Sequence, residues 1–461
     1  MSRLLISAAH KSSGKTTITI GLCAALAENA TVQPFKKGPD YIDPMWIGRA
    51  AKRPCHNLDF YTMTENEIIN TVGHYSHGSD IALIEGNKGL YDGLDLDGSN
   101  SNAALATLIK APVILVLDAR GMTRGIAPLI LGYQSFDPEI NIAGVVLNQL
   151  GGSRHEQKLR SVIEHYTDVT VVGAVYRNKD LSIEERHLGL MPSNEDDSAD
   201  IKITQIRELI KDQIDLHNIR QIAEQSEVLT RSAITSSNIT KKDLRIGVAH
   251  NDAFGFYYPG DLDALKNAGA ELINIDPIRD TKLADIDGLF IGGGFPETRM
   301  HELQANAQLR KEIKQAIEAG LPCYAECGGL MYLSRSLSWH DKKCEMVGVI
   351  QADTIMHERP QGRGYVRLQE THHHPWYPFE PQPENIIAGH EFHYSSLKNI
   401  EPSTHYAYKI LRGHGIDGEH DGIVYKNLLA CYAHLRDTNA NHWAQRFVQL
   451  VRQYKQQPSR L

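Results

Sequence analysis

Residues 2–26 read SRLLISAAHKSSGKTTITIGLCAAL, and this stretch decides the fold of the N-terminal half of the chain. Residues 2–9 form a short apolar run, as a buried strand does, and the segment from Thr16 to Leu26 has the apolar spacing of a helix. Between them, AHKSSGKT at 9–16 meets the pattern G-x-x-x-x-G-K-[ST], except that Ala9 stands where the first glycine is usual. A strand, such a loop and a helix in succession predict a phosphate-binding loop.

The residues of this loop suit an anion. Gly14 lets the backbone approach a phosphate, and the N–H groups at the start of the helix point at it. The Lys15 ammonium would reach the outer phosphates, and the Thr16 hydroxyl would coordinate Mg²⁺. An accidental Gly-Lys-Thr at a helix start is the alternative, but the strand–loop–helix context argues against it. The predicted ATP- and phosphate-binding residues of the loop are Lys11, Ser13, Gly14, Lys15, Thr16 and Thr17.

Short apolar runs recur along this half of the chain, each followed by loop and helix signals. They lie at 81–84, 113–117 and 142–147, and one more strand candidate lies at 171–175. Near-continuous apolar strands that alternate with helices indicate a mostly parallel sheet with both faces covered. The first half is therefore predicted to be an α/β domain.

A polar segment, EQSEVLTRSAITSSNITKKD at 224–243, separates this half from a second α/β pattern. Many short strand-like pieces follow from residue 346, which predicts a mixed sheet there. The second half has strand candidates at 245–249, 271–275, 288–291 and 321–325, and helix candidates at 260–268 and 302–319. The expected organisation is a first domain over 1–223, a linker over 224–243 and a second domain over 244–461.

The composition excludes several classes of protein. The chain has 461 residues, 41% of them hydrophobic and 23% charged, which suits two soluble domains. A net charge of -8 argues against a nucleic-acid partner. Six scattered cysteines are too few for a disulfide framework and fit a reducing cytoplasm. No apolar run reaches the ~18 to 20 residues of a membrane span, and a homodimer is the assembly that base rates favour.

Acidic residues with the chemistry to hold Mg²⁺ or a substrate follow two predicted strands. Glu85 ends the run IALIE, where carboxylates of a parallel sheet face the ligand cleft, so Glu85 and Thr16 are the predicted metal ligands. Asp92 follows in a glycine-rich loop. Residues 34–43, PFKKGPDYID, place two lysines after a short strand and suit an anionic substrate beside ATP. For each acid alone, a solvated loop carboxylate is the plainer interpretation.

The second half has its own reactive candidate in LPCYAECGGL at 321–330. Cys327 stands at a strand-to-helix turn before two glycines, as in a nucleophile elbow, and we expect the helix N-terminus to lower the thiol pKa. Such a thiol needs a histidine within reach. Upstream, the loop GGGFPE at 292–297 offers backbone N–H groups of Gly293 and Gly294 for an oxyanion hole.

Other readings of the two cysteines stay open. A zinc site would need two further ligands at matching spacing, and a disulfide is disfavoured in the cytosol. A buried structural pair is the main alternative to a nucleophile. Cys323 lies within the predicted strand and is the better candidate for a core residue.

Taken together, the motifs resemble one known family along nearly the whole chain. The chain contains, in that family's order, GKTT, VQPFKKGPDYIDP, EGNKGLYDG, GVVLNQLGGSRHEQKLR, RHLGLMPSNE, GGGFPE, YAECGGLMYL, GHEFHYS and a late AHL. These motifs resemble the cobyrinic acid a,c-diamide synthases. The resemblance implies an ATP-binding domain similar to dethiobiotin synthetase, followed by a triad-type glutamine amidotransferase domain.

The resemblance also implies a reaction. Glutamine would be hydrolysed at Cys327 with His434. ATP and Mg²⁺ would phosphorylate the a- and c-acetates of cobyrinic acid, and ammonia would displace phosphate from the acyl phosphate to leave an amide. By the same match, the adenine-reading residue would be Asn148, and the residues on the side of the anionic tetrapyrrole would be Asp40, Tyr41, Tyr91 and Asp92.

Three features fall outside the family's usual assignments. Triad amidotransferases usually carry a Glu two residues after the histidine, but the sequence here is His434-Leu435-Arg436, so no carboxylate that orients the imidazole is visible. Residues 370–376 read ETHHHPW, and three adjacent histidines such as His372–His374 are more often solvent-facing than ligands. The histidines of GHEFHYS, His390 and His393, have no assigned chemistry.

Two other functions stay open on the sequence. Related enzymes amidate sirohaem or nickel-sirohydrochlorin, and the ATP and glutaminase motifs cannot separate rings that carry equivalent acetates. A regulatory phosphate-loop ATPase with an inactive glutaminase-like domain is a different class. That class predicts no glutaminase activity and no effect of Cys327→Ala.

Overall fold

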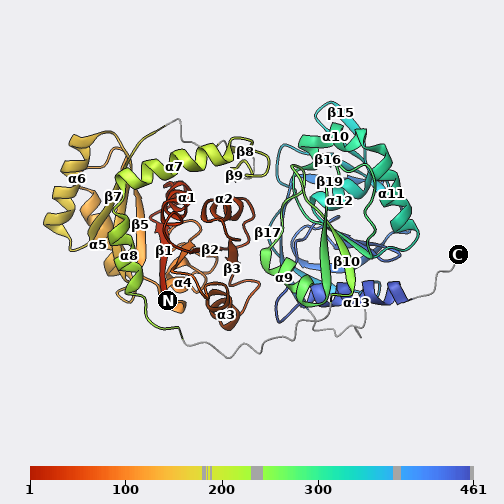
Figure 1. Cartoon of the computed structure of the whole chain (residues 1–461), viewed down its shortest axis with the longest axis horizontal. Coiled ribbons are helices and arrows are strands. Elements are labelled where there is room, and N and C mark those ends of the chain that lie inside the picture. The colour runs from red at the N-terminus through yellow and green to blue at the C-terminus, as the bar shows by residue number, and fades with distance from the viewer. Residues whose placement is uncertain (179–182, 184, 187–188, 230–241, 377–385, 457–461) are drawn as a thin grey trace. The chain divides into compact units, whose positions relative to one another are not determined.

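The computed structural model describes residues 1–456 except for 179–182, 184, 187–188, 230–241 and 377–385. The chain divides into two compact units, Met1–Ile234 and Thr235–Leu461, which are described separately (Figure 1). Of the predicted linker, residues 230–241 lie outside the described residues, and Glu224 is the last residue of a helix. The domain limits drawn from the sequence stay a prediction. Among the helices described, none has the length and apolar character to cross a membrane.

The first unit is built on a seven-stranded sheet in the order β3-β2-β4-β1-β5-β6-β7. Every neighbouring pair in it is parallel. The strands are β1 (Ser2–Ala8), β2 (Val32–Lys37), β3 (His56–Leu58), β4 (Ile81–Glu85), β5 (Val113–Asp118), β6 (Ile142–Leu150) and β7 (Thr170–Tyr176), with a separate short pair, β8 (Glu185–Arg186) and β9 (Gly189–Leu190). The strands predicted from the five apolar runs are confirmed as β1, β4, β5, β6 and β7.

Helices cover this sheet on both faces. All five residues of β4 are buried, although successive side chains of a strand point to opposite faces. Helix α1 contacts both α2 and α7. Helix α5 packs on α6. The helices of this unit are α1 (Lys15–Leu26), α2 (Ile42–Ala51), α3 (Glu65–Tyr75), α4 (Asn102–Leu108), α5 (Ile126–Phe136), α6 (Ser153–Tyr166), α7 (Ala199–Gln213) and α8 (Leu216–Glu224).

The second unit contains a nine-stranded sheet in the order β11-β10-β12-β13-β22-β21-β20-β17-β18. Pairs from β11 to β22 are parallel, and the remaining pairs are antiparallel, so the mixed sheet predicted for the tail is confirmed. The strands are β10 (Leu244–Ala249), β11 (Ala270–Ile275), β12 (Gly288–Ile291), β13 (Cys323–Glu326), β17 (Gly362–Glu370), β18 (Ile386–His393), β20 (His405–Arg412), β21 (His420–Tyr425) and β22 (Leu428–Cys431).

A four-stranded sheet and several helices complete this unit. The small sheet has the order β15-β14-β16-β19, with β14 (Ser334–Trp339), β15 (Lys342–Glu345), β16 (Ile350–Met356) and β19 (Ser395–Lys398). The helices are α9 (Pro259–Asn267), α10 (Met300–Ala305), α11 (Ala307–Glu318), α12 (Gly328–Leu333) and α13 (Trp443–Gln456), with a 3₁₀ turn over Pro296–Arg299.

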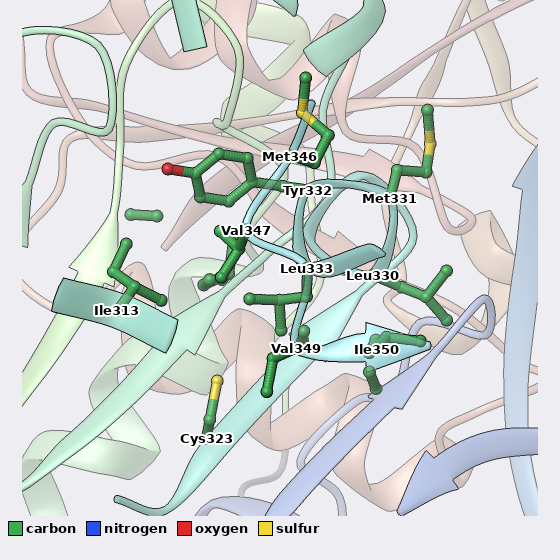
Figure 2. Packing of buried hydrophobic residues seen from close by; sticks show 14 of the residues in the cluster. Ile313, Cys323, Leu330, Met331, Tyr332, Leu333, Met346, Val347, Val349 and Ile350 are labelled. Atoms are coloured by element: carbon green, nitrogen blue, oxygen red, sulfur yellow. The ribbon is translucent and has the colours of Figure 1, made fainter. Parts of the chain in front are cut away.

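The short helix α12 carries apolar side chains into the core of this unit. Leu330 and Leu333 belong to a buried cluster with Val349 and with Ile350, the first residue of β16 (Figure 2). Cys323 of β13 lies in the same cluster and is 0% exposed. Its prediction as a strand and core residue is confirmed.

One predicted element is wrong. The pattern at 302–319 predicted a single helix, but α10 ends at Ala305 and α11 begins at Ala307. Asn306 separates them because its side chain accepts a hydrogen bond from Leu309 N (3.4 Å) while its Nδ2 donates to Asp280 O (2.8 Å). An Asn side chain that caps a new helix cannot also continue the old one.

Candidate active sites

The loop between β1 and α1 is fixed by a residue of β6. Gly14 has φ 85°, and a Cβ there would lie 2.1 Å from Nδ2 of Asn148, so only glycine fits. That Nδ2 donates to Ser13 O at 2.9 Å. Asn148 therefore holds the loop in place, and its role in reading adenine stays a prediction.

The other loop residues differ in exposure. The Lys15 ammonium is largely buried and donates to Lys88 O at 2.6 Å, and burial lowers the pKa of Lys15. The buried Ser13 hydroxyl donates to His10 O at 2.8 Å. Lys11 is exposed and Thr17 is half-buried. α1 begins at Lys15 without a side-chain cap, as expected of a helix N-terminus that binds an anion.

A buried lysine and three carboxylates converge beside Thr16. Lys36 Nζ lies 2.6 Å from Glu85 Oε1, 2.6 Å from Asp43 Oδ2 and 3.7 Å from Asp40 Oδ2. The Thr16 hydroxyl lies 2.8 Å from the same Glu85 oxygen and 3.2 Å from the same Asp43 oxygen. Burial would lower the pKa of Lys36, but Asp43 and Glu85 outweigh it and raise that pKa well above its usual value.

The two lysines of PFKKGPDYID, Lys36 and Lys37, do not lie where the sequence predicted. They were expected to follow a strand, but they are the last two residues of β2 and both are buried. Lys37 Nζ lies 3.2 Å from Asn87 Oδ1, and burial lowers the pKa of Lys37 to about 8. Both ammonium groups therefore lie inside the site rather than on a solvated face.

The oxygens beside Lys36 suit Mg²⁺. Glu85 is fully buried, and its Oε2 has no hydrogen-bond partner in the part of the chain that the structure describes. Hydroxyl and carboxylate oxygens are the ligands that Mg²⁺ prefers, so Thr16, Glu85 and Asp43 fit this ion. Asp43 had no metal role in the sequence-based prediction. The described residues contain no group of three or more His, Cys, Asp and Glu arranged as a metal site.

Two of the predicted substrate residues lie at the start of α2. Asp40 Oδ1 accepts from Ile42 N at 2.9 Å and from Asp43 N at 3.2 Å. Burial and the neighbouring Asp43 carboxylate raise the pKa of Asp40. Tyr41 is the N-cap residue of α2 and is buried. This pair is therefore adjacent to the Lys36 cluster.

The other two predicted substrate residues, Tyr91 and Asp92, lie beside the start of the phosphate loop. The Tyr91 hydroxyl donates to Tyr133 O at 2.6 Å, and the Tyr133 hydroxyl donates to Ala9 O at 2.5 Å. Asp92 Oδ2 accepts from Gly89 N at 2.9 Å, and a Cβ on Gly89 would lie 2.7 Å from Ala9 O. The glycine-rich loop after β4 is thus packed against the loop after β1.

The second unit places Cys327 at a strained elbow between β13 and α12. Its φ is 45° and its ψ is -100°, a conformation that side chains rarely adopt. Its N–H donates to Cys431 O at 2.8 Å. Burial and the Glu297 carboxylate raise the pKa of the Cys327 thiol, although the Gly328 N–H opposes them. The N–H at the start of α12 therefore lowers this pKa as expected, but burial outweighs it, and the thiol needs a base.

Glycines bring the candidate oxyanion loop against both the elbow and His434. A Cβ at Gly293 would lie 2.6 Å from Cε1 of His434. A Cβ at Gly328 would lie 2.9 Å from Gly294 O and 3.0 Å from Gly294 N. The segment of the predicted nucleophile, the predicted histidine and the predicted oxyanion loop therefore lie next to one another.

His434 is fixed from several sides. Its Nδ1 lies 3.1 Å from Glu326 Oε2, and its ring stacks on His390 with centroids 4.9 Å apart. Its N–H donates to His390 O at 2.8 Å. Burial, His434 and Arg436 lower the pKa of His390 well below its usual value. Within GHEFHYS, His390 therefore supports the ring of His434.

Glu326 is the residue that sequence reasoning missed. The signal that was available is an acidic residue at the carboxyl end of a buried strand, directly before the nucleophile candidate. Its partner His434 is 108 residues away along the chain, so the contact itself could not be predicted.

The histidine run ETHHHPW is only partly solvent-facing. His372 is exposed, and its ring lies 3.8 Å from that of His373. The His374 side chain is 4% exposed, and its Nε2 lies 3.0 Å from the Tyr408 hydroxyl. The expectation that these residues face solvent is wrong for His374, because that imidazole packs against Tyr408 and Trp376.

A phosphate loop with a carboxylate cluster in one unit and a Cys–His elbow in the other define an ATP-using glutamine amidotransferase. A family model described as CobQ/CobB/MinD/ParA nucleotide binding domain matches residues 5–190. A second, described as CobB/CobQ-like glutamine amidotransferase domain, matches residues 245–442. The predicted pair of α/β domains is confirmed, and the chain is an enzyme, a glutamine-hydrolysing carbon–nitrogen ligase.

The chain belongs to the cobyrinate a,c-diamide synthase family. It is 42% identical to the cobyrinate a,c-diamide synthase of Magnetococcus marinus over 96% of this chain and 95% of that one. It is 42% identical to the synthase of Methanosarcina acetivorans over 94% of this chain and 92% of that one. For the synthase of Methanosarcina barkeri the identity is 39%, over 98% of this chain and 96% of that one. The family resemblance inferred from the motifs is confirmed.

Proposed function

We propose that the chain amidates the a- and c-acetate carboxylates of cobyrinate, using ATP and glutamine. The observation that carries this proposal is the match over nearly the full length to relatives named cobyrinate a,c-diamide synthase. The two candidate sites supply the chemistry that such a reaction needs. The six cysteines are all free, which supports a reducing compartment such as the cytoplasm.

The first unit would activate the carboxylate. A carboxylate oxygen attacks the γ-phosphorus of ATP, ADP leaves, and the acyl phosphate then loses inorganic phosphate when ammonia attacks its carbonyl carbon. Lys15 and the N-terminus of α1 would bind the phosphates. Mg²⁺, held by Thr16, Glu85 and Asp43, would supply charge neutralisation on the transferring phosphoryl group. Asp40, Tyr41, Tyr91 and Asp92 would position the tetrapyrrole, and the exposure of Asp92 and its neighbours leaves this side of the site accessible to a large substrate.

The second unit would supply ammonia. Cys327 Sγ attacks the amide carbon of glutamine while His434 accepts the thiol proton and then gives it to the leaving ammonia. The N–H groups of Gly293 and Gly294 would stabilise the tetrahedral oxyanion. Water then cleaves the thioester and releases glutamate. The raised pKa of the buried thiol supports a mechanism in which the base acts within the same step.

The ring is the least constrained part of the proposal, and one assay tests it. Purified enzyme is given ATP, Mg²⁺ and glutamine with cobyrinate, sirohaem or nickel-sirohydrochlorin in parallel reactions, and mass spectrometry counts the amides formed. We expect two amides on cobyrinate and a much smaller rate on the other rings. A preference for sirohaem or nickel-sirohydrochlorin would contradict the proposed substrate but would leave the reaction type intact.

A further inference from the structure

The usual position of the third triad residue is not available in this chain. The residue two positions after His434 is Arg436, whose guanidinium lies over the ring of Tyr258 at 5.1 Å. A cation there cannot accept a hydrogen bond from an imidazole N–H. Any carboxylate that orients His434 must therefore come from elsewhere in the fold.

We propose that Glu326, the residue directly before Cys327, positions His434 and completes a Glu–His–Cys glutaminase triad. This inference rests on the proposed glutamine hydrolysis. Glu326 Oε2 lies 3.1 Å from His434 Nδ1, and both residues are only 3% exposed. Because an ionised carboxylate only accepts, this contact places the proton on Nδ1 and leaves Nε2 to accept the thiol proton.

The carboxylate is fixed by donors on its other oxygen. Glu326 Oε1 accepts from the Tyr324 hydroxyl at 2.5 Å and from Leu435 N at 3.0 Å. Burial, with Cys431 and Glu326 nearby, raises the pKa of Tyr324 well above its usual value, so this hydroxyl keeps its proton and remains a donor. Through Leu435 N–H, Glu326 also holds the backbone next to His434. The contacts of both Glu326 oxygens therefore hold the His434 imidazole in one orientation.

The fold makes this arrangement compact. β13 and β22 are neighbouring parallel strands in which Glu326 pairs with Cys431, so Glu326 and the segment leading to His434 leave the sheet at one edge. The positive φ of Cys327 then turns the chain sharply after Glu326. One strand end therefore carries both the orienting carboxylate and the nucleophile.

Neighbouring buried carboxylates have other partners. Asp421 accepts from Tyr432 N at 3.0 Å and from Ala433 N at 2.9 Å. Glu391 accepts from His414 N at 2.6 Å and from Gly415 N at 2.8 Å. Glu326, in contrast, contacts the His434 ring through its Oε2.

Glu326→Gln is the first test. The glutamine side chain keeps the shape and one acceptor oxygen, but it has no charge to stabilise the imidazolium and can impose the wrong tautomer. We expect glutaminase kcat to fall about 10²- to 10⁴-fold with KM little changed. Alkylation of Cys327 by iodoacetamide should slow in parallel, while ammonia-dependent amidation and the melting temperature stay near those of the unmodified enzyme.

A double-mutant cycle separates positioning from a purely structural role. If Glu326 acts through His434, Glu326→Gln should cause almost no further loss of glutaminase activity in a His434→Ala background. An additive loss would overturn the proposal. Asp353→Asn is the matched control, because Asp353 of β16 accepts from the Ser336 hydroxyl, which can also accept from an amide, and pairs with Arg335, so this variant should retain the unmodified kcat.

The remaining outcomes are also decisive. Wild-type kcat in Glu326→Gln would overturn the inference. If that variant does not fold, Glu326→Asp is the second test. It keeps the negative charge but moves the carboxylate away from His434, because the side chain is one methylene shorter. We then expect a lower kcat at unchanged KM, and an unchanged kcat would overturn the inference. Absence of glutaminase activity in the unmodified enzyme would instead reject the proposed function on which the inference rests.

Discussion

Glu85 shows how much chemistry depends on one residue of the first unit. It is fully buried, one oxygen contacts Lys36 and Thr16, and the other has no hydrogen-bond partner among the described residues. Its place at a strand end was predictable, because apolar strands followed by an acid have a clear pattern. Its partners Lys36 and Asp43 were not, because nothing in the sequence shows that their side chains turn toward the same point.

Glu85→Gln should remove amidation but not glutamine hydrolysis. The amide is nearly isosteric but neutral, so it binds Mg²⁺ poorly and leaves Lys36 less compensated. We expect kcat for amidation with ammonia to fall about 10²- to 10³-fold, measured by amide formation, while glutaminase activity is retained. Asp196→Asn is the matched control, since this buried carboxylate pairs with Lys202. Equal losses in the two variants would contradict a special role for Glu85.

Because the pKa of Lys37 is lowered, we expect substrate binding to depend on pH. Burial lowers its pKa to about 8, against the opposing effect of Asp59 and with the help of Lys88 and Lys36. The ammonium form binds an anionic carboxylate, so KM for the tetrapyrrole should rise as the pH increases through about 8. Lys37→Arg should flatten this rise, because guanidinium stays charged. A KM that does not change between pH 7 and about 9 in the unmodified enzyme would contradict the role of Lys37.

The same shift means that Lys37 itself does not favour unfolding as the pH rises. A lysine whose pKa is lowered in the folded state binds fewer protons than in the unfolded state between pH about 8 and its ordinary value of about 10.4. The contribution of Lys37 to the free energy of unfolding therefore increases with pH over that range. A thermal melt at each pH separates the two effects.

At the scale of elements, periodicity predicted most strands but not their partners. The apolar runs gave β1, β4, β5, β6 and β7 because a parallel sheet buries whole strands. The pairing of β13 with β22 joins residues more than 100 positions apart and has no local signal. For the same reason the Cys327 elbow was predictable from its glycines, whereas the raised pKa of its thiol depends on burial and on Glu297 from another segment.

The glycine loop after β12 should be intolerant of a side chain. A Cβ at Gly293 would lie 2.6 Å from Cε1 of His434, so alanine must displace the imidazole or the loop. A displacement of this kind costs about 10²-fold in rate. We expect Gly293→Ala to lower glutaminase kcat by about that factor and to preserve ammonia-dependent amidation. Gly132→Ala, where an added Cβ meets nothing within 4 Å, is the control. Normal glutaminase activity in Gly293→Ala would show that the loop is not part of the site.

At the scale of the whole molecule, the chain consists of two units with separate cores and separate chemistry. The order of motifs along the chain was enough to predict both units and the family. The identity of the ring was not predictable, because the motifs describe phosphate transfer and ammonia release rather than the substituents of a macrocycle. Mg²⁺ binding and a homodimer stay predictions.

The central claim is that ammonia made at Cys327 is used for ATP-dependent amidation of cobyrinate. One experiment compares the unmodified enzyme, Cys327→Ser and Lys15→Ala with cobyrinate and ATP, supplying either glutamine or ammonia, and mass spectrometry measures the diamide. We predict that the unmodified enzyme uses both nitrogen sources, Cys327→Ser uses ammonia alone, and Lys15→Ala uses neither. Glutamine-dependent amidation by Cys327→Ser, or no amidation of cobyrinate by the unmodified enzyme from either source, would contradict the claim.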